Sequence, residues 1–163
     1  MTDPAFNRVL LLARHAHREL HDRSNDNGLS GKGWEQARAL TRYVLKKFPN
    51  AKWEFLSSPK ARCRETLEPL SIQQGSEVRI NPLLDEQEGQ SEALFKMRIQ
   101  KFLEEWKKSA NPYTLACSHG DWIPEFVYLA IGQHQDLKKG GVIWLELTAQ
   151  KSLVAVEVHQ ELL

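Results

Sequence analysis

The sequence has little cysteine, almost no net charge and no long apolar run. Its two cysteines, Cys63 and Cys117, are too few for a disulfide framework or a four-thiolate metal site. We therefore expect a cytoplasmic protein without a metal or cofactor. A net charge of +1 predicts neither nucleic acid nor a membrane as a partner. No run approaches the length of a membrane span, and residues 1–8 lack the pattern of a signal peptide.

The composition that remains is ordinary for a globular protein. With 163 residues, 41% hydrophobic and 26% charged, the chain predicts a single domain over residues 1–163 with a sizeable core. Strands are expected at residues 9–13, 53–56, 77–80, 113–117, 142–147 and 153–158, and helices at about 31–47, 60–73, 92–108 and 122–131. This alternation predicts an α/β three-layer sandwich with a mainly parallel central sheet and an antiparallel hairpin at one edge.

The first expected strand, residues 9–13, ends abruptly in Arg14 and His15, with His17 and Arg18 close behind. A run that is apolar throughout is typical of a strand buried on both faces. Open α/β folds bind their ligands at the carboxyl ends of such strands. An Arg beside a His at this place can hold an anion and attack it, although a solvated basic loop would give the same pattern.

Two other expected strands end in similar residues. Residues 53–56 lead through a Ser-Ser-Pro turn to Arg62, and residues 113–117 lead to His119 and Gly120. Because the carboxyl ends of parallel strands share one edge, we expect two Arg and two His side chains to form one pocket. The alternatives are an exposed Arg62 in the first turn of a helix, which is a poor place for a cation without an anion, and a structural His119.

Such a pocket suits phosphoryl transfer. Guanidinium groups match phosphate oxygens, and a neutral imidazole can attack phosphorus. We expect the two arginines to lower the pKa of His15 and a backbone carbonyl to accept a hydrogen bond from its other ring nitrogen. A protonated His119 would stabilise the transition state, together with backbone N–H groups at Gly120 and Asp121.

A leaving alkoxide also needs a proton donor. The loop Leu83–Gly89 offers three acids, Asp85, Glu86 and Glu88, and the residue pattern does not choose among them. A solvated acidic loop is equally consistent with it. His17 and Arg18 could extend the pocket toward a second anionic group, or they could form a solvated basic loop.

Five segments, in order, resemble the histidine phosphatase superfamily, which contains the cofactor-dependent phosphoglycerate mutases. The family hallmark Arg-His-Gly stands here as Arg14-His15-Ala16, with a small Ala that we expect to be tolerated in place of Gly. The other similar segments are residues 28–37 (Leu-Thr-x-x-Gly-x-x-Gln-Ala in the family), residues 57–66 (Ser-Ser-Pro-x-x-Arg-Ala-x-Gln-Thr), Leu84-Asp85-Glu86 (Leu-x-Glu) and Ser118-His119-Gly120 (Ser-His-Gly).

The resemblance implies that His15 is the phosphorylated nucleophile and Glu86 the proton donor. It also implies that the phosphoryl group is bound by the side chains of Arg14, Arg62 and His119. The expected fold is phosphoglycerate mutase-like. The chain is short for the superfamily and resembles its small phosphatases, including bacterial phosphohistidine phosphatases.

The expected activity is that of a metal-independent phosphatase acting on a small phosphorylated metabolite or a phosphoprotein. One alternative is a mutase, which needs a lid that excludes water and for which little sequence is available. Another is a weakly catalytic phosphate-binding or interaction module, against which the intact Arg and His residues argue. The sequence predicts neither the natural substrate, ester or phosphohistidine, nor the oligomeric state.

Overall fold

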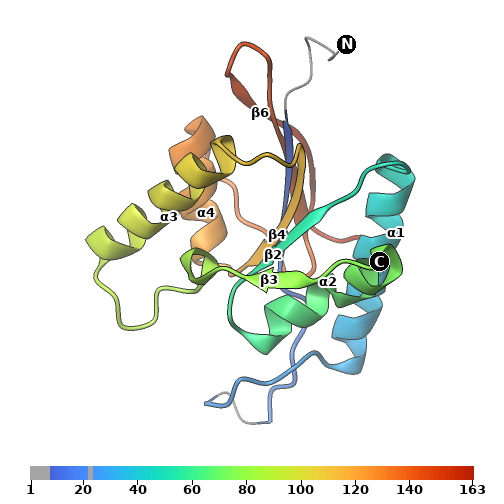
Figure 1. The fold of residues 1–163 in the computed structure, drawn as a ribbon. Coiled ribbons are helices and arrows are strands. Elements are labelled where there is room, and N and C mark those ends of the chain that lie inside the picture. The colour runs from blue at the N-terminus through green and yellow to red at the C-terminus, as the bar shows by residue number, and fades with distance from the viewer. Residues whose placement is uncertain (1–7, 22–23) are drawn as a thin grey trace.

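A six-stranded mixed sheet forms the centre of the computed structural model, which describes residues 8–21 and 24–163 (Figure 1). The strands are β1 (Arg8–Arg14), β2 (Glu54–Ser57), β3 (Val78–Ile80), β4 (Tyr113–Ser118), β5 (Val142–Leu147) and β6 (Leu153–His159), in the order β3-β2-β4-β1-β5-β6. The pairs β1–β4, β2–β4 and β2–β3 are parallel, whereas β1–β5 and β5–β6 are antiparallel. The sheet is therefore mainly parallel with an antiparallel edge, as expected.

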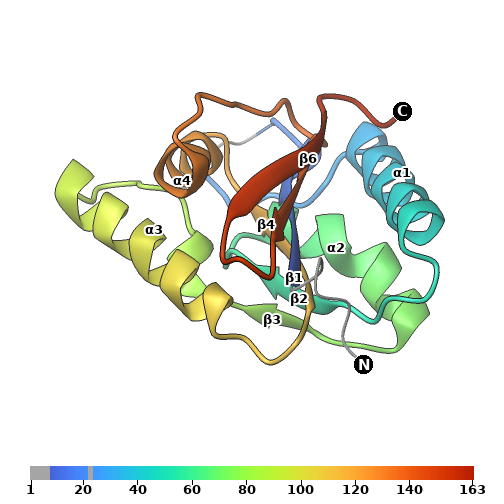
Figure 2. The same cartoon turned by 90° about the horizontal axis from the view of Figure 1, so that it is seen from above.

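Strand β1 lies inside the sheet because its side chains are apolar on both faces. Leu10 and Leu12 belong to one hydrophobic cluster, and Val9 and Leu11 belong to the other. Two pairs of helices cover these faces: α1 (Gly31–Lys47) with α2 (Ala61–Gln74), and α3 (Glu92–Lys107) with α4 (Trp122–Ile131). Figure 2 shows the two pairs on opposite sides of the sheet. The three expected layers are confirmed.

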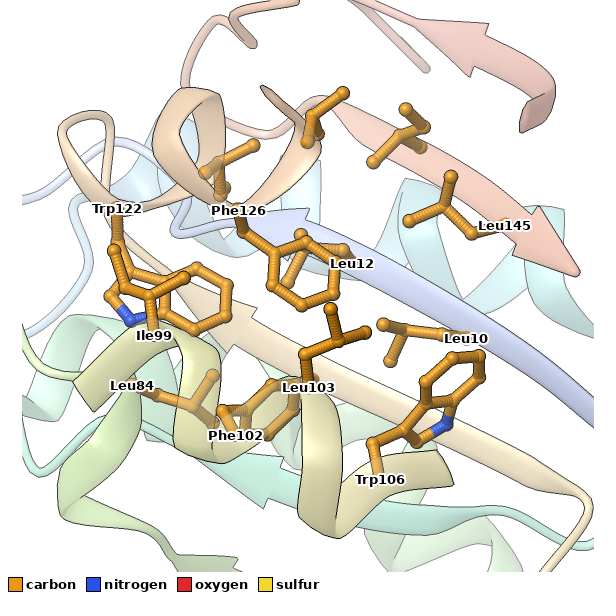
Figure 3. Packing of buried hydrophobic residues seen from close by; sticks show 14 of the residues in the cluster. Leu10, Leu12, Leu84, Ile99, Phe102, Leu103, Trp106, Trp122, Phe126 and Leu145 are labelled. Atoms are coloured by element: carbon orange, nitrogen blue, oxygen red, sulfur yellow. The ribbon is translucent and has the colours of Figure 1, made fainter. Parts of the chain in front are cut away.

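Aromatic rings fill the core beneath α3 and α4 (Figure 3). The ring of Trp122 stacks on Phe126 with centroids 5.1 Å apart, and Phe102 meets Trp122 edge-on at 5.3 Å. All three side chains are fully buried. Helix α3 supplies Phe102 to this packing, which holds α4 and the turn before it against the sheet.

The helix starts follow from capping residues. Ser30 caps α1 by accepting from the Gly33 N–H at 3.1 Å, and Ser91 caps α3 by accepting from the Leu94 N–H at 3.2 Å. Helix α2 takes its cap from a distant loop, because the Asp26 carboxylate accepts from the Ala61 N–H at 2.9 Å. The loop before α3 contains a 3-10 turn, η1 (Pro82–Leu84), that the sequence analysis did not predict.

Parallel pairing brings three strand ends to one edge of the sheet. Arg14 lies beside Ser118 in the β1–β4 register, and Ser57 lies beside Cys117 in the β2–β4 register. The bonding continues past the strands, since the His15 N–H donates to the Ser118 carbonyl at 3.1 Å. The expected convergence is confirmed. No helix among the described residues is long and apolar enough to cross a membrane.

Candidate active site

Four basic side chains meet where β1, β2 and β4 end. The ring centroids of His15 and His119 lie 5.4 Å apart. Arg62, in the first turn of α2, donates from Nη2 to Nδ1 of His119 at 3.5 Å. The side chains of His15, Arg62 and His119 are buried, and Arg14 is partly buried. Because buried cations are costly without a compensating charge, this cluster is suited to bind an anion.

The imidazole of His15 is held in one orientation. Its Nδ1 lies 2.8 Å from the Ala16 carbonyl oxygen, so Nδ1 carries the proton and Nε2 has a free lone pair. Burial lowers the pKa of His15 to about 3, against the opposing effect of the Ala16 hydrogen bond. Arg62, Arg14 and Lys139 also contribute to this lowered pKa. The expected direction is correct, but burial, and not the arginines, is the largest cause.

His119 is also neutral in the structure. Its pKa is lowered to about 2, mainly by burial and also by the nearby His15 and Arg62. Nε2 lies 2.7 Å from the Ser58 hydroxyl oxygen, while Nδ1 accepts from Arg62. This lowered pKa favours the neutral form of His119 in the ligand-free site, so the protonated form considered in the sequence analysis would have to arise on binding of an anion. A bound anion would raise the pKa of His119, because an opposite charge favours the cationic form.

The guanidinium of Arg14 is positioned by a carbonyl and a glycine. Its Nη1 donates to the Leu137 carbonyl at 2.8 Å. A Cβ atom built on Gly120 would lie 2.7 Å from Cζ of Arg14, so this contact requires glycine. Within the described part of the chain, the buried Nε atoms of Arg14 and Arg62 have no hydrogen-bond partner. Both are therefore donors suited to phosphate oxygens.

The structure distinguishes the three acids of the loop before α3. The Glu86 carboxylate accepts from Arg62 at 3.0 Å and lies 3.6 Å from Nδ1 of His119. Asp85 accepts from the Glu86 N–H at 2.9 Å. Glu88 is exposed, and its hydrogen bond to Lys60 lowers its pKa. Glu86 therefore makes the shorter contacts with the basic cluster, whereas Asp85 Oδ1 lies 3.9 Å from Nε2 of His119.

The three acids of this loop lie close enough together to ligate a metal ion, and the expectation that the protein needs no metal stays a prediction. One oxygen from each of Asp85, Glu86 and Glu88 lies within 4.8 Å of the others. The ammonium of Lys60 pairs with both Asp85 and Glu88, and Arg62 pairs with Glu86. Lys60 and Arg62 thus already supply the positive charge that a metal ion would otherwise bring to these carboxylates.

Two small pockets open at the cluster. One, of about 130 Å³, is lined by His15, Arg18, Leu20, Arg62 and Lys139. The other, of about 160 Å³, shares Arg18 and Arg62 and reaches Lys60 and the acidic loop. A larger cavity of about 440 Å³ lies between α3 and α4, apart from the strand ends.

The two extra candidates, His17 and Arg18, have different surroundings. The His17 Nδ1 lies 2.6 Å from the Ser30 hydroxyl oxygen at the start of α1, and His17 does not line either pocket at the cluster. Arg18 lines both. Lys139 also lines the first pocket, and the sequence analysis missed it because it belongs to no recognisable motif.

Ala16 fits at the position where glycine is usual in the family. Its methyl group is buried beside Leu29 and Ala37, and its N–H donates to the Thr66 hydroxyl at 2.9 Å. The extra methyl group therefore packs into the protein, which agrees with the expected tolerance.

A model of the histidine phosphatase superfamily (branch 1) matches residues 10–94, just over half of the chain. No curated protein sequence gives a significant match. Among solved structures, a candidate alpha-ribazole-5'-P phosphatase from Escherichia coli is similar with a TM-score of 0.78 and 16% identity, over 94% of this chain and 97% of that one.

Two further structures share the fold. A mutant phosphoserine phosphatase from Entamoeba histolytica, in complex with phosphoserine, has a TM-score of 0.73 and 17% identity, over 93% of this chain and 96% of that one. The protein histidine phosphatase SixA, complexed with tungstate, has a TM-score of 0.69 and 17% identity, over 92% and 95%. The phosphoglycerate mutase-like fold expected from the sequence is confirmed.

Gly120→Ala should weaken anion binding without unfolding the protein. The added methyl group would push the Arg14 guanidinium away from the cluster, and a lost charge-assisted contact costs roughly 10-fold or more in affinity. Calorimetric titration with tungstate measures this loss. Gly31→Ala, where a Cβ meets nothing within 4 Å, is the control. Equal affinity of the two variants would contradict the role given to Gly120.

The two buried imidazoles should make stability depend on pH. In the unfolded chain a histidine takes up a proton near pH 6.5, whereas His15 and His119 stay neutral down to about pH 3 and about pH 2 in the folded protein. The unfolded state thus binds more protons below pH 6.5. The free energy of unfolding should therefore fall as the pH falls below 6.5, by about 1 kcal/mol per pH unit for each imidazole.

Urea unfolding between pH 7 and pH 5, in buffers without phosphate, measures this slope. The range lies above the titration of ordinary carboxyl groups. A His15→Asn/His119→Asn double variant should lose most of the pH dependence. The same slope in the double variant would mean that other groups cause it.

Proposed function

Because this chain belongs to the histidine phosphatase superfamily, we propose that it is a metal-independent phosphatase that forms a phosphohistidine on His15. The observation that carries the proposal is the state of the His15 ring. The Ala16 carbonyl holds the proton on Nδ1, which leaves Nε2 as a nucleophile beside Arg14, Arg62 and His119. The low pKa of His15 keeps that nitrogen unprotonated at neutral pH.

The first step transfers the phosphoryl group to His15. Arg14 and Arg62 bind its oxygens in this proposal, and the group would replace Glu86 as the partner of Arg62. The bond from phosphorus to Nε2 forms while the bond to the leaving oxygen breaks. Once the phosphoryl group has replaced it beside Arg62, Glu86 takes up a proton from the solvent and delivers that proton to the leaving oxygen. His119 stabilises the charge that develops on the equatorial oxygens.

In the second step water attacks the phosphohistidine. Phosphorus gains the water oxygen, Nε2 of His15 recovers its lone pair, and Glu86 takes up the proton of the attacking water. When inorganic phosphate leaves, Glu86 releases this proton to the solvent and pairs with Arg62 again, which restores the starting enzyme. The groups that bind the phosphoryl oxygens and move the protons in both steps are all side chains, so the proposed chemistry requires no divalent metal.

The reaction class has alternatives within the same site. A mutase would have to keep water from the phosphohistidine, and the described segments next to this site that join helices and strands are residues 16–21, 24–30 and 81–90. A phosphoramidate is an alternative substrate class. Glu86 is ion-paired with Arg62 in the ligand-free site, and an imidazole leaving group needs less protonation by such an acid than an alkoxide does. The substrate in this proposal is a small phosphorylated molecule or a phosphoprotein.

His15→Ala should abolish turnover of an aryl phosphate and leave the fold intact. The wild-type enzyme quenched during turnover should carry a phosphate that is labile in acid and stable in base. His134→Ala, an exposed residue on the loop after α4, is the control and should keep the wild-type rate. A chelator should change neither enzyme. Near-normal rates in His15→Ala, or activity that depends on one metal, would refute the mechanism.

Glu86→Gln should separate substrates by their leaving group. An alkoxide needs a proton in the transition state, so hydrolysis of an alkyl phosphate should slow roughly 10²–10⁴-fold. An aryl phosphate with an acidic phenol should slow much less. The exposed Glu92→Gln, at the start of α3, is the control for a lost carboxylate.

Equal slowing of both substrates would mean that Glu86 is not the acid. Asp85→Asn and Glu88→Gln test the other two carboxylates in the same assay. If all three variants hydrolyse alkyl esters at full rate, the loop supplies no acid, and a phosphoramidate becomes the better substrate class.

A further inference from the structure

The loop between η1 and α3, residues 85–91, carries the proposed proton donor Glu86 (Figure 1). In the proposed first step the phosphoryl group replaces Glu86 as the partner of Arg62. The carboxyl group then has to stay within reach of the leaving oxygen without this ion pair. Its place at that moment depends on how firmly the backbone of Glu86 is held.

The guanidinium of Arg98, in the second turn of α3, holds this backbone. Its Nη1 donates to the carbonyl oxygens of Leu83, at 3.1 Å, and Asp85, and its Nη2 donates to the carbonyl oxygen of Glu86 at 3.0 Å. Hydrogen bonds from a charged donor are about twice as strong as neutral ones. Three carbonyl groups in and next to the loop thus converge on one side chain.

The same guanidinium also bonds to the far end of the loop. The side-chain oxygen of Gln90 accepts from Nε of Arg98 at 3.0 Å and from Nη2 at 2.9 Å. The Gln90 N–H donates in turn to the Gln87 carbonyl at 3.0 Å. Arg98 therefore joins the two ends of the loop that contains Glu86. This role uses the planar fork of an arginine, because its donors point in several fixed directions.

The core beneath α3 holds Arg98 in turn. Its Cζ lies over the Phe95 ring, 5.0 Å from the ring centre, and Phe95 belongs to the buried cluster on this side of the sheet. Phe95 lies three residues before Arg98, so the two side chains share one face of the helix. The hydrogen bonds to the loop therefore start from a side chain whose own place is set by the packed core.

Two side chains from other elements hold η1, which precedes the loop. The Ser118 hydroxyl donates to the Leu84 carbonyl at 2.6 Å, and the Trp122 indole N–H donates to the Leu83 carbonyl at 2.7 Å. These bonds fix where the loop begins. The arginine, by contrast, bonds to the carbonyl of the proposed proton donor itself.

We propose that Arg98 is a positioning residue for proton transfer by Glu86. By holding the Glu86 carbonyl, it keeps the carboxyl group directed at the cluster after the phosphoryl group has displaced that group from Arg62. Arg98 itself neither binds the phosphoryl group nor carries the transferred proton. This assignment rests on the proposed phosphatase function and on Glu86 as its acid.

The test compares an alkyl phosphate, which needs the acid, with an aryl phosphate of an acidic phenol, which needs it much less. Arg98→Met should lower kcat/KM for the alkyl phosphate roughly 10–100-fold, because a misplacement of about 1 Å can cost about 100-fold in rate. The aryl phosphate reaction should slow much less. A merely structural arginine would slow both reactions alike.

Arg98→Lys should act in the same direction, since one ammonium cannot replace the fork, and it provides the test if Arg98→Met does not fold. Lys101→Met is the matched control, because it removes a cation from an exposed position on the same helix. It should leave both rates unchanged.

The double variant Arg98→Met/Glu86→Gln shows whether the arginine acts through the acid. If it does, the alkyl phosphate reaction should be no slower in the double variant than in Glu86→Gln alone. Losses that multiply would mean that Arg98 acts independently of Glu86 and would overturn the proposal. Equal slowing of both substrates in Arg98→Met and Arg98→Lys would overturn it as well.

Failure of the proposed function gives different results. Absence of aryl phosphate turnover in the wild-type enzyme would refute the phosphatase, and equal slowing of both substrates in Glu86→Gln would refute the acid. The positioning role would end with either. If Glu86→Gln slows the alkyl phosphate selectively and the two Arg98 variants do not, the positioning role alone is wrong.

Discussion

The parallel pairing of β4 with β1 on one side and β2 on the other is the constraint on which the site depends. It aligns Arg14 with Ser118 and Ser57 with Cys117, so the chain leaves all three strands at the same edge. Parallel strands of this kind are stable only when both faces are covered. The two helix pairs that provide this cover also carry Arg62, at the start of α2, to the strand ends.

Burial gives the cluster its chemistry. It lowers the pKa of both His15 and His119, so that two imidazoles remain neutral beside two guanidinium groups. In the ligand-free structure the Glu86 carboxylate balances Arg62. A phosphoryl group would bring more negative charge to the same place. Anion binding, release of Glu86 and protonation of His119 are therefore linked by one electrostatic balance in the proposed mechanism.

The surrounding loops are held by side chains that have no chemical role in the proposal. Asp26 caps α2, and the Glu65 carboxylate accepts from the Leu29 N–H at 2.8 Å, so the loop after β1 is attached to α2 at two points. Gln36 attaches the same region to the segment before β5. These contacts give the pocket its walls and bring Arg18 and Lys139 to its mouth.

The sequence by itself determined the strands and α-helices, the layered α/β arrangement and the four basic residues of the cluster, but not the 3-10 turn η1. Apolar periodicity and the polar residues after each strand are properties of neighbouring residues, so they can be read locally. Only the tertiary structure shows that Glu86 is the acid paired with Arg62 and that Lys139 lines the pocket beside His15. It also shows that His17 contacts Ser30 and lines neither pocket at the cluster. Those outcomes depend on packing between residues far apart in the chain, and no local pattern records the burial that sets the pKa of His15.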